Sequence, residues 1–127
     1  MAVKSSHSRR ASRSKRIVVA TPTGRRVIRP SEVAWIAADD YYAAVHVGTR
    51  RYLVRESLTS LARRLGSSMF IRVHRSAIVN LDYVRELRML AWGGLVMLAD
   101  GTAVRVSRRR RESLRSALKL IHHSPTK

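Results

Sequence analysis

Residues 70–84, which read FIRVHRSAIVNLDYV, are the most informative stretch of the 127-residue chain. Polar and charged side chains interrupt the apolar ones at irregular spacing, and these are Arg72, His74, Arg75, Ser76 and Asn80. A strand inside a core would be apolar throughout, or would alternate regularly if one face were exposed. The stretch therefore predicts extended or irregular chain whose polar residues serve something other than packing.

Short apolar segments upstream of this stretch predict strands, and they lie at residues 17–20, 27–28, 33–36, 43–47 and 52–54. The first two flank the turn-forming sequence TPTG at 21–24, which predicts a hairpin. The third and fourth lie on either side of the sequence AADDY at 37–41. We expect five strands here, the first two forming the hairpin.

A helical pattern follows these strands. Apolar residues recur at the spacing of one helical face, at Leu58, Leu61, Ala62 and Leu65. Gly66 comes next, where a left-handed residue commonly ends a helix. The pattern predicts one short amphipathic helix that opens at Ser57.

Downstream of the central stretch, residues 83–87 are a further strand candidate and WGG at 92–94 predicts a loop. Apolar residues at 95–98 and 104–106 flank Asp100 and Gly101. Asp-Gly pairs close two-residue hairpins because both central residues take positive φ, so we expect such a hairpin here. A last helical face is formed by Leu114, Ala117, Leu118 and Ile121. It predicts a helix that begins near Arg109, with Ser107 as its N-cap.

Charge is the second strong feature of the sequence. The chain has 26 Lys and Arg against 8 Asp and Glu, a formal charge of +18, and 45% hydrophobic residues that supply a core. Residues 1–16 hold six basic residues, five serines and no acid, which predicts a disordered basic arm. We expect the folded domain at 17–121 and a C-terminal tail at 122–127. Because residues 17–127 retain a charge of +12, the domain itself is basic, as is typical of nucleic-acid-binding proteins.

Several classes of protein are disfavoured by what the sequence lacks. The absence of cysteine excludes disulfides, thiolate zinc sites and a cysteine nucleophile. No apolar stretch approaches the roughly 18 residues of a membrane span, and residues 1–16 lack the apolar centre of a signal peptide, so we expect a cytoplasmic, nucleoid-associated protein. No Gly-rich phosphate loop, Gly-x-Ser-x-Gly elbow or metal-ligating His spacing is present. We therefore expect no enzyme activity, no cofactor and no metal.

The central stretch resembles the signature of the LytTR DNA-binding domains of bacterial transcription regulators. The matching residues are Phe70, Arg72, His74, Arg75, Ser76, Val79, Asn80, Leu81 and Val84. The similarity extends to residues 32–36, 41–42, 55–58, 98–101 and 106–108, so it covers about residues 17–120. It implies a mainly β, elongated domain with short helices.

The resemblance further implies that three loops, at 39–42, 74–76 and 107–109, enter successive major grooves of bent DNA. Base contacts are expected from Arg75, Arg108, Tyr41 and His74. Phosphate contacts are expected from Tyr42, Arg72, Ser76, Ser107, Arg109, Arg110 and Arg111. The chemistry of arginine agrees, since its planar fork of donors binds guanine O6 and N7 and also neutralises phosphates.

Some of these residues also allow a structural interpretation. The alternative to DNA contact for Tyr41 and Tyr42 is that one packs on the sheet and the other is merely exposed. Asp39 and Asp40 would repel DNA unless they pair with arginines or point away. His74 either orients its loop or contacts DNA. Asn80 is expected to hold a turn through backbone hydrogen bonds rather than to read adenine.

The two tryptophans also allow a choice between packing and binding. Trp35 lies within an apolar segment and is expected in the core. Trp92 lies beside two glycines and is either a loop residue or a stacking platform for bases.

The function that the sequence favours is sequence-specific binding of double-stranded DNA by a bacterial transcription regulator, with two copies on repeated half-sites. The alternative, an RNA-binding or ribosome-associated basic protein, fits the charge equally. An RNA-recognition sheet, however, presents an aromatic pair in a Gly-rich pattern, and Phe70 is the only phenylalanine. Since residues 1–30 are too few for a receiver domain, we expect control by a missing receiver domain or by a regulatory protein partner.

Overall fold

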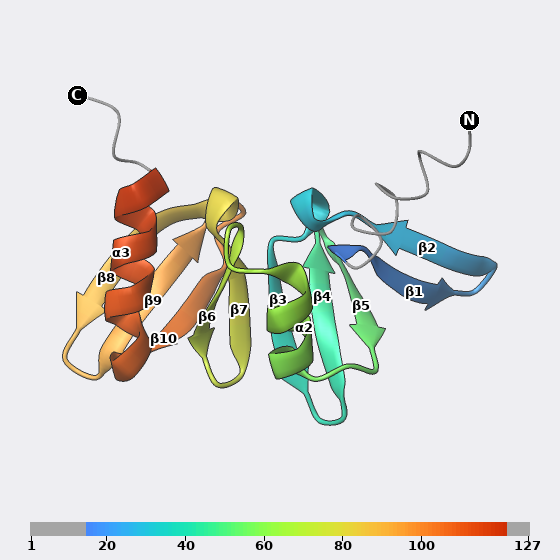
Figure 1. Cartoon of the computed structure of the whole chain (residues 1–127), viewed down its shortest axis with the longest axis horizontal. Helices are drawn as coiled ribbons and strands as arrows, with labels where there is room; N and C mark the ends of the chain where they lie inside the picture. Colours follow the sequence, from blue (N-terminus) through green and yellow to red (C-terminus); the bar gives the residue numbers. More distant parts are fainter. Residues whose placement is uncertain (1–14, 122–127) are drawn as a thin grey trace.

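The computed structural model describes residues 15–121, and antiparallel strands dominate them (Figure 1). The strands are β1 (Ile17–Thr21), β2 (Gly24–Ile28), β3 (Trp35–Asp39), β4 (Tyr42–Val47), β5 (Arg50–Val54), β6 (Phe70–His74), β7 (Ala77–Asn80), β8 (Val84–Leu90), β9 (Gly93–Leu98) and β10 (Ala103–Ser107). The helices are η1 (Pro30–Glu32), α2 (Leu58–Leu65), η2 (Leu81–Tyr83), η3 (Arg108–Arg110) and α3 (Arg111–Ile121). The predicted mainly β fold with short helices is confirmed. Most of the predicted arm (residues 1–14) and the tail (122–127) lie outside the described residues.

A five-stranded sheet in the order β5-β4-β3-β7-β6 forms the centre of the domain. The four residues of β7 are all buried, because this strand is covered on both faces. Ile78 pairs with Ile36 of β3 and faces one core, whereas Ala77 and Val79 face the other. The alternation of side chains along a strand thus lets β7 contribute to two cores at once.

The first core lies between this sheet, the β1–β2 hairpin and α2. The helix α2 begins after Ser57, whose side chain accepts a hydrogen bond from the backbone N–H of Ser60 at 3.0 Å. It buries Leu58, Leu61 and Leu65, the face that the sequence predicted. Its end is marked by Gly66 at φ 82°, a left-handed backbone that glycine adopts without a steric cost.

The second core lies between β6 and β7, the three-stranded sheet β10-β9-β8 and α3. Val73 and Val79 of the larger sheet pack there with Val96, Val106 and Leu114. The two sheets lie side by side, which makes the domain elongated, as Figure 1 shows. The β3–β4, β6–β7 and β8–β9 turns, the β5–α2 connection and the start of the last helix lie along its lower edge in that view.

The predicted hairpin between β9 and β10 is present, but its turn type differs from the predicted two-residue turn. The backbone N–H of Gly101 donates to the carbonyl of Leu98 at 2.9 Å, and Leu98 N–H donates to Thr102 O at 2.9 Å. The connection is therefore a three-residue loop in which only Gly101 (φ 91°), and not Asp100, takes positive φ. A turn followed by a left-handed glycine is the second common hairpin type, and the Asp-Gly pair serves it equally well.

Several other boundaries also differ from the sequence-based ones. Strand β3 continues to Asp39, which leaves only Asp40 and Tyr41 in the β3–β4 turn. The predicted WGG loop is shorter, because Gly93 and Gly94 already belong to β9. The last helix begins with the short 3-10 turn η3, and Ser107 lies at its N-cap position without a side-chain capping bond.

The glycine at position 93 generates a prediction about stability. A Cβ atom there would lie 2.5 Å from the carbonyl oxygen of Val106, and its φ is 151°. We expect Gly93→Ala to lower the free energy of unfolding by about 3 kcal/mol or more, because steric overlap with backbone adds to conformational strain. The matched control is Gly48→Ala, whose φ is 59° but whose Cβ would meet nothing within 4 Å. It should cost only about 1 kcal/mol in the same denaturant titration. Equal losses in the two variants would contradict the close approach at Gly93.

Candidate nucleic-acid interface

The β6–β7 turn is held by an arginine rather than left free. Arg72 donates from Nε to the carbonyl of His74 at 3.1 Å, and from its second terminal nitrogen to the carbonyl of Arg75 at 2.6 Å. A third, longer bond of 3.3 Å reaches the Thr59 hydroxyl on α2. Arg72 therefore fixes the turn relative to the helix, and its half-buried guanidinium is directed inward.

At the tip of this turn, the side chain of Arg75 is exposed and donates no hydrogen bond to the described part of the chain. His74 is oriented by Ser76, whose backbone N–H donates to Nδ1 at 3.2 Å and whose hydroxyl lies 2.9 Å from the same nitrogen. Since Nδ1 accepts, the ring proton of neutral His74 is assigned to Nε2. The turn thus presents one free guanidinium and one oriented imidazole.

Burial lowers the pKa of His74, and the positive charges of Arg105, Arg75, Arg110 and Arg72 lower it further. A cation in this cluster is disfavoured by desolvation and by like charge, so the neutral ring predominates near pH 7. The cluster brings together residues that are far apart in sequence. It indicates a strongly positive surface around the turn.

The β3–β4 turn lies on the same edge. Asp40 takes φ 55°, a left-handed conformation in which Asp is enriched among non-glycine residues, and Tyr41 is 86% exposed. Asp39 is paired with Arg51 at 2.8 Å, which compensates its charge, whereas Asp40 has no ion pair among the described residues. Tyr42 has the guanidinium of Arg55 5.8 Å from its ring centroid.

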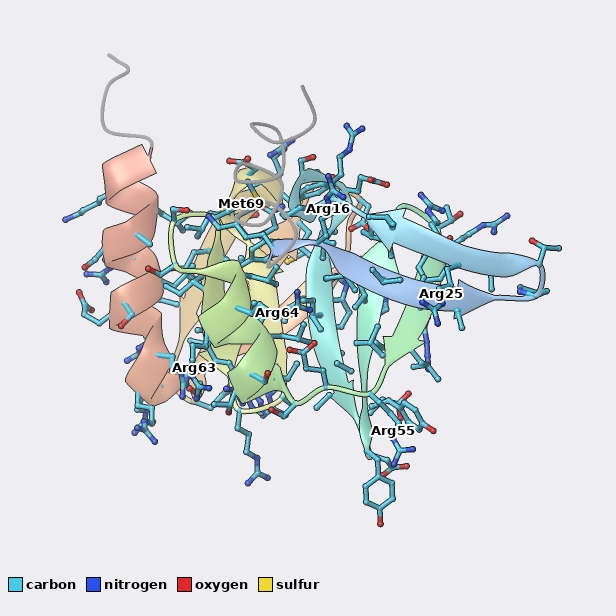
Figure 2. All side chains as sticks on the ribbon, turned by 45° about the vertical axis from the view of Figure 1, so that its right-hand side comes forward. Arg16, Arg25, Arg55, Arg63, Arg64 and Met69 are labelled. Atoms are coloured by element: carbon cyan, nitrogen blue, oxygen red, sulfur yellow. The ribbon has the colours of Figure 1, made fainter. Side chains whose placement is uncertain are left out.

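These two turns line a common groove of about 400 Å³. Its lining includes Tyr41, Tyr42, Arg55, Arg72 and Arg75. Figure 2 shows Arg55 near the lower end of the domain, in the connection that leads from β5 to the start of α2. Four of these five residues were predicted site residues, whereas Arg55 lies in the 55–58 segment of the family resemblance but was not predicted to contact DNA.

The arginines that begin the last helical segment fall into two groups. Arg108 donates to the carbonyl of Ala91, and Arg111 donates to the carbonyls of Leu90 and Gly93 at 2.7 and 2.8 Å. Both arginines therefore hold the β8–β9 turn. In contrast, Arg109 is exposed, and Arg110 is half-buried near Arg72 and His74.

Two other predicted site residues are directed into the protein. The hydroxyl oxygen of Ser107 is buried and has no hydrogen-bond partner among the described residues. Asn80 is fully buried; its amide donates to Val33 O at 2.8 Å and its Oδ1 accepts from Asp82 N at 2.9 Å. Neither side chain is exposed at the edge.

Comparison with known protein families identifies the domain. The family model described as the LytTr DNA-binding domain matches residues 24–119. The chain belongs to the LytTR DNA-binding domain family. A solved LytTr DNA-binding domain from Bacillus cereus has the same fold, with a TM-score of 0.74 and 25% identity over 82% of this chain and 96% of that one. The predicted family membership is confirmed.

Relatives of this LytTR domain occur within longer regulators. The heme-containing CO-sensing transcriptional regulator RcoM 2 of Paraburkholderia xenovorans is 36% identical over 92 residues, which are 71% of this chain and 34% of the relative. The CO-responsive transcriptional regulator RcoM of Rhodospirillum rubrum is 39% identical over 69 residues, 54% and 29% of the two chains. The sensory transduction protein LytT of Bacillus subtilis is 28% identical over 99 residues, 76% and 39%. The chain thus spans about a third of the length of the curated relatives it matches.

Residues 15–121 offer neither a metal site nor a membrane-spanning helix. There, no three His, Asp or Glu side chains lie close enough to hold a metal ion. No helix in that range is long and apolar enough to cross a membrane. The most distinctive surface of this part of the chain is the positively charged edge, which carries Arg55, Arg75, Arg109 and Arg110.

The lowered pKa of His74 generates a prediction about pH. Because this pKa lies below its ordinary value of 6.5, the unfolded state binds more protons as pH falls through that value, and the free energy of unfolding must decrease. The pKa of His46 is also lowered, first by burial and then by Arg51, so it acts in the same direction. The carboxylates with lowered pKa, such as Glu56, lose their contribution only below about 4.5.

We therefore expect stability to fall from about pH 7.5 to about pH 5.5, and His74→Gln to make this fall shallower. Denaturant unfolding at several pH values measures both, and comparison at the alkaline end isolates the cost of the substitution itself. An identical pH slope in the variant and the natural chain would contradict the assignment.

The unpartnered hydroxyl of Ser107 generates a second prediction. Removing a buried polar group that has no partner costs nothing, so Ser107→Ala should leave the free energy of unfolding unchanged or raise it by up to about 1 kcal/mol. The matched control is Ser57→Ala, which removes the N-cap bond to Ser60 and should cost about 1 kcal/mol. A loss for Ser107→Ala as large as for Ser57→Ala would show that its hydroxyl has a partner.

Proposed function

We propose that this LytTR domain binds double-stranded DNA with sequence preference and acts in transcription regulation, and that its edge turns enter successive major grooves. The main support for this proposal is the exposed guanidinium of Arg75. It lies at the tip of a turn that Arg72 holds through hydrogen bonds to the carbonyls of His74 and Arg75. A braced turn costs little conformational entropy on binding. The free guanidinium of Arg75, presented by this turn, can bind the O6 and N7 acceptors of guanine.

Base reading is proposed for Arg75, Arg108, Tyr41 and His74. Arg108 uses one of its five donors on Ala91, so its remaining donors stay available to a base. Tyr41 offers a hydroxyl and a ring at the tip of the neighbouring turn. Neutral His74 offers a donor at Nε2.

Phosphate binding is proposed for Arg109 and Arg110, and with them for Tyr42, Ser76 and the newly found Arg55. The geometry favours a different role for Arg72 and Arg111, because their donors already bond turn carbonyls. They act on DNA binding by fixing the turns. Ser107 lies below the surface and is proposed to have no phosphate contact.

Two copies are proposed to bind one site on repeated half-sites. A single small domain with four base-reading side chains offers limited specificity, and a second copy increases it. Regulation is proposed to come from a partner protein or from a further domain, in agreement with the length of the relatives. The corresponding location is the cytoplasm, at the nucleoid.

Binding of structured RNA by the same edge is the alternative, and one selection experiment distinguishes the two. A selection from random DNA duplexes should return a sequence motif, and the selected duplex should compete better than an RNA duplex of equal length. A selection that returns no motif, or tighter binding to RNA, would overturn the proposal.

The division between base-reading and phosphate-binding arginines is testable with three variants. Arg75→Ala should reduce discrimination between the selected and a mutated site by about 1–3 kcal/mol. Arg109→Ala should weaken all duplexes about equally and reduce the slope of log affinity against log salt by about 0.9. The matched control is Arg25→Ala, an exposed arginine on the β1–β2 hairpin, away from the edge (Figure 2). It should change neither quantity by a comparable amount, and equal effects of Arg75→Ala and Arg109→Ala would contradict the assignment.

A further inference from the structure

Trp92 is an exposed aromatic residue that neither core nor the three proposed loops use. It lies in the two-residue β8–β9 turn, and 48% of its surface is exposed. Single exposed hydrophobic side chains are common on proteins, so exposure alone indicates nothing. The arginines that hold this turn and the arginine beside the indole ring distinguish Trp92 from a merely exposed residue.

The turn that carries Trp92 is held at three carbonyls. Arg108 bonds the carbonyl of Ala91, and Arg111 bonds those of Leu90 and Gly93. Gly93 also approaches Val106 so closely that no side chain fits there. The backbone on both sides of the indole is therefore fixed against β10 and η3, the segment that carries the proposed base-reading Arg108.

A second arginine connects Trp92 to the β6–β7 turn. The guanidinium carbon of Arg105 lies 4.9 Å from the centroid of the Trp92 ring. The same residue lines a groove of about 330 Å³ with His74 and Ser76, and its charge contributes to the lowered pKa of His74. One positively charged surface thus runs from Arg75 across Arg105 to Trp92.

We propose that Trp92 and Arg105 form a fourth contact with duplex DNA, in which the indole packs on a deoxyribose beside the groove that Arg108 enters. The cation on one ring face leaves the other face for the apolar side of the sugar. Arg105 neutralises the adjacent phosphate, and the indole N–H donates to a phosphate oxygen. Contacts of this kind set position and affinity and carry no base sequence.

This inference rests on the proposed function and can be tested separately from it. Trp35 is the only other tryptophan in the sequence, and it is half-buried and stacked on His46 at a centroid distance of 4.3 Å. The difference in emission between the natural chain and Trp92→Phe therefore reports on Trp92 alone. Acrylamide quenching of that component should fall when the selected DNA duplex saturates the protein. Trp35 lines the groove beside His74 and Arg105, so its own quenching is measured in Trp92→Phe with and without the duplex and subtracted.

Affinity provides the second readout. Trp92→Ala should weaken binding of selected and random duplexes alike, by roughly tenfold, and Trp92→Phe should retain most of the affinity. The matched control is Leu53→Ala, which truncates an equally exposed side chain (47%) on β5 and should have no effect. Denaturant unfolding of Trp92→Ala verifies that the domain remains folded.

The possible failures are distinct. If the duplex binds the natural chain but quenching of Trp92 is unchanged, or if Trp92→Ala binds as well as Leu53→Ala, the fourth contact is wrong and the proposed function stands. If the natural chain binds no duplex, both are overturned.

Discussion

One buried amide, that of Asn80, joins the two halves of the domain. Within residues 15–121 it is the only polar side chain classed with the core, at 0% exposure. Its bonds to Val33 and Asp82, and its backbone bond to Ala34 at 3.0 Å, tie the end of β7 to the segment before β3 and to η2. The chain leaves the five-stranded sheet for the three-stranded sheet at this point. Because β7 contributes to both cores, the relative position of the two sheets depends on an amide whose loss would leave buried backbone groups unsatisfied.

Some arginines hold the turns and others are presented by them, while Arg108, which bonds a turn carbonyl and is exposed, does both. Arg72, Arg108 and Arg111 donate to backbone carbonyls of the β6–β7 and β8–β9 turns. Arg75 and Arg109 are exposed beside them. A carbonyl bonded by a cation is satisfied without a secondary-structure partner, so the turn keeps its shape and also gains positive charge. This arrangement accounts for a basic edge that is ordered before any ligand arrives, which lowers the entropic cost of binding.

Local patterns in the sequence predicted the family, the fold class and α2, because helix spacing, capping residues and the 70–84 signature are properties of neighbouring residues. The roles of individual arginines were beyond this reach. In the run of arginines at 108–111, sequence alone does not distinguish a residue that bonds a carbonyl 18 positions away from one that is exposed. Arg105 reaches the edge through tertiary folding alone, so no local signal marks it. Arg55 lies in the 55–58 segment of the resemblance, but that pattern does not indicate that its side chain reaches the edge. The Asp100 and Gly101 pair was assigned to the wrong turn type because two hairpin types share that dipeptide.

Methylation interference on a selected duplex measures whether the edge turns enter the major groove at two or more places. Dimethyl sulfate methylates guanine N7 in the major groove and adenine N3 in the minor groove. If the turns enter the major groove, methylation of guanine N7 blocks binding in patches separated by about one helical turn, roughly 10 base pairs, whereas methylation of adenine N3 within the same patches is tolerated. Interference that is confined to adenine N3, or a site in which no guanine shows interference, would contradict entry into the major groove.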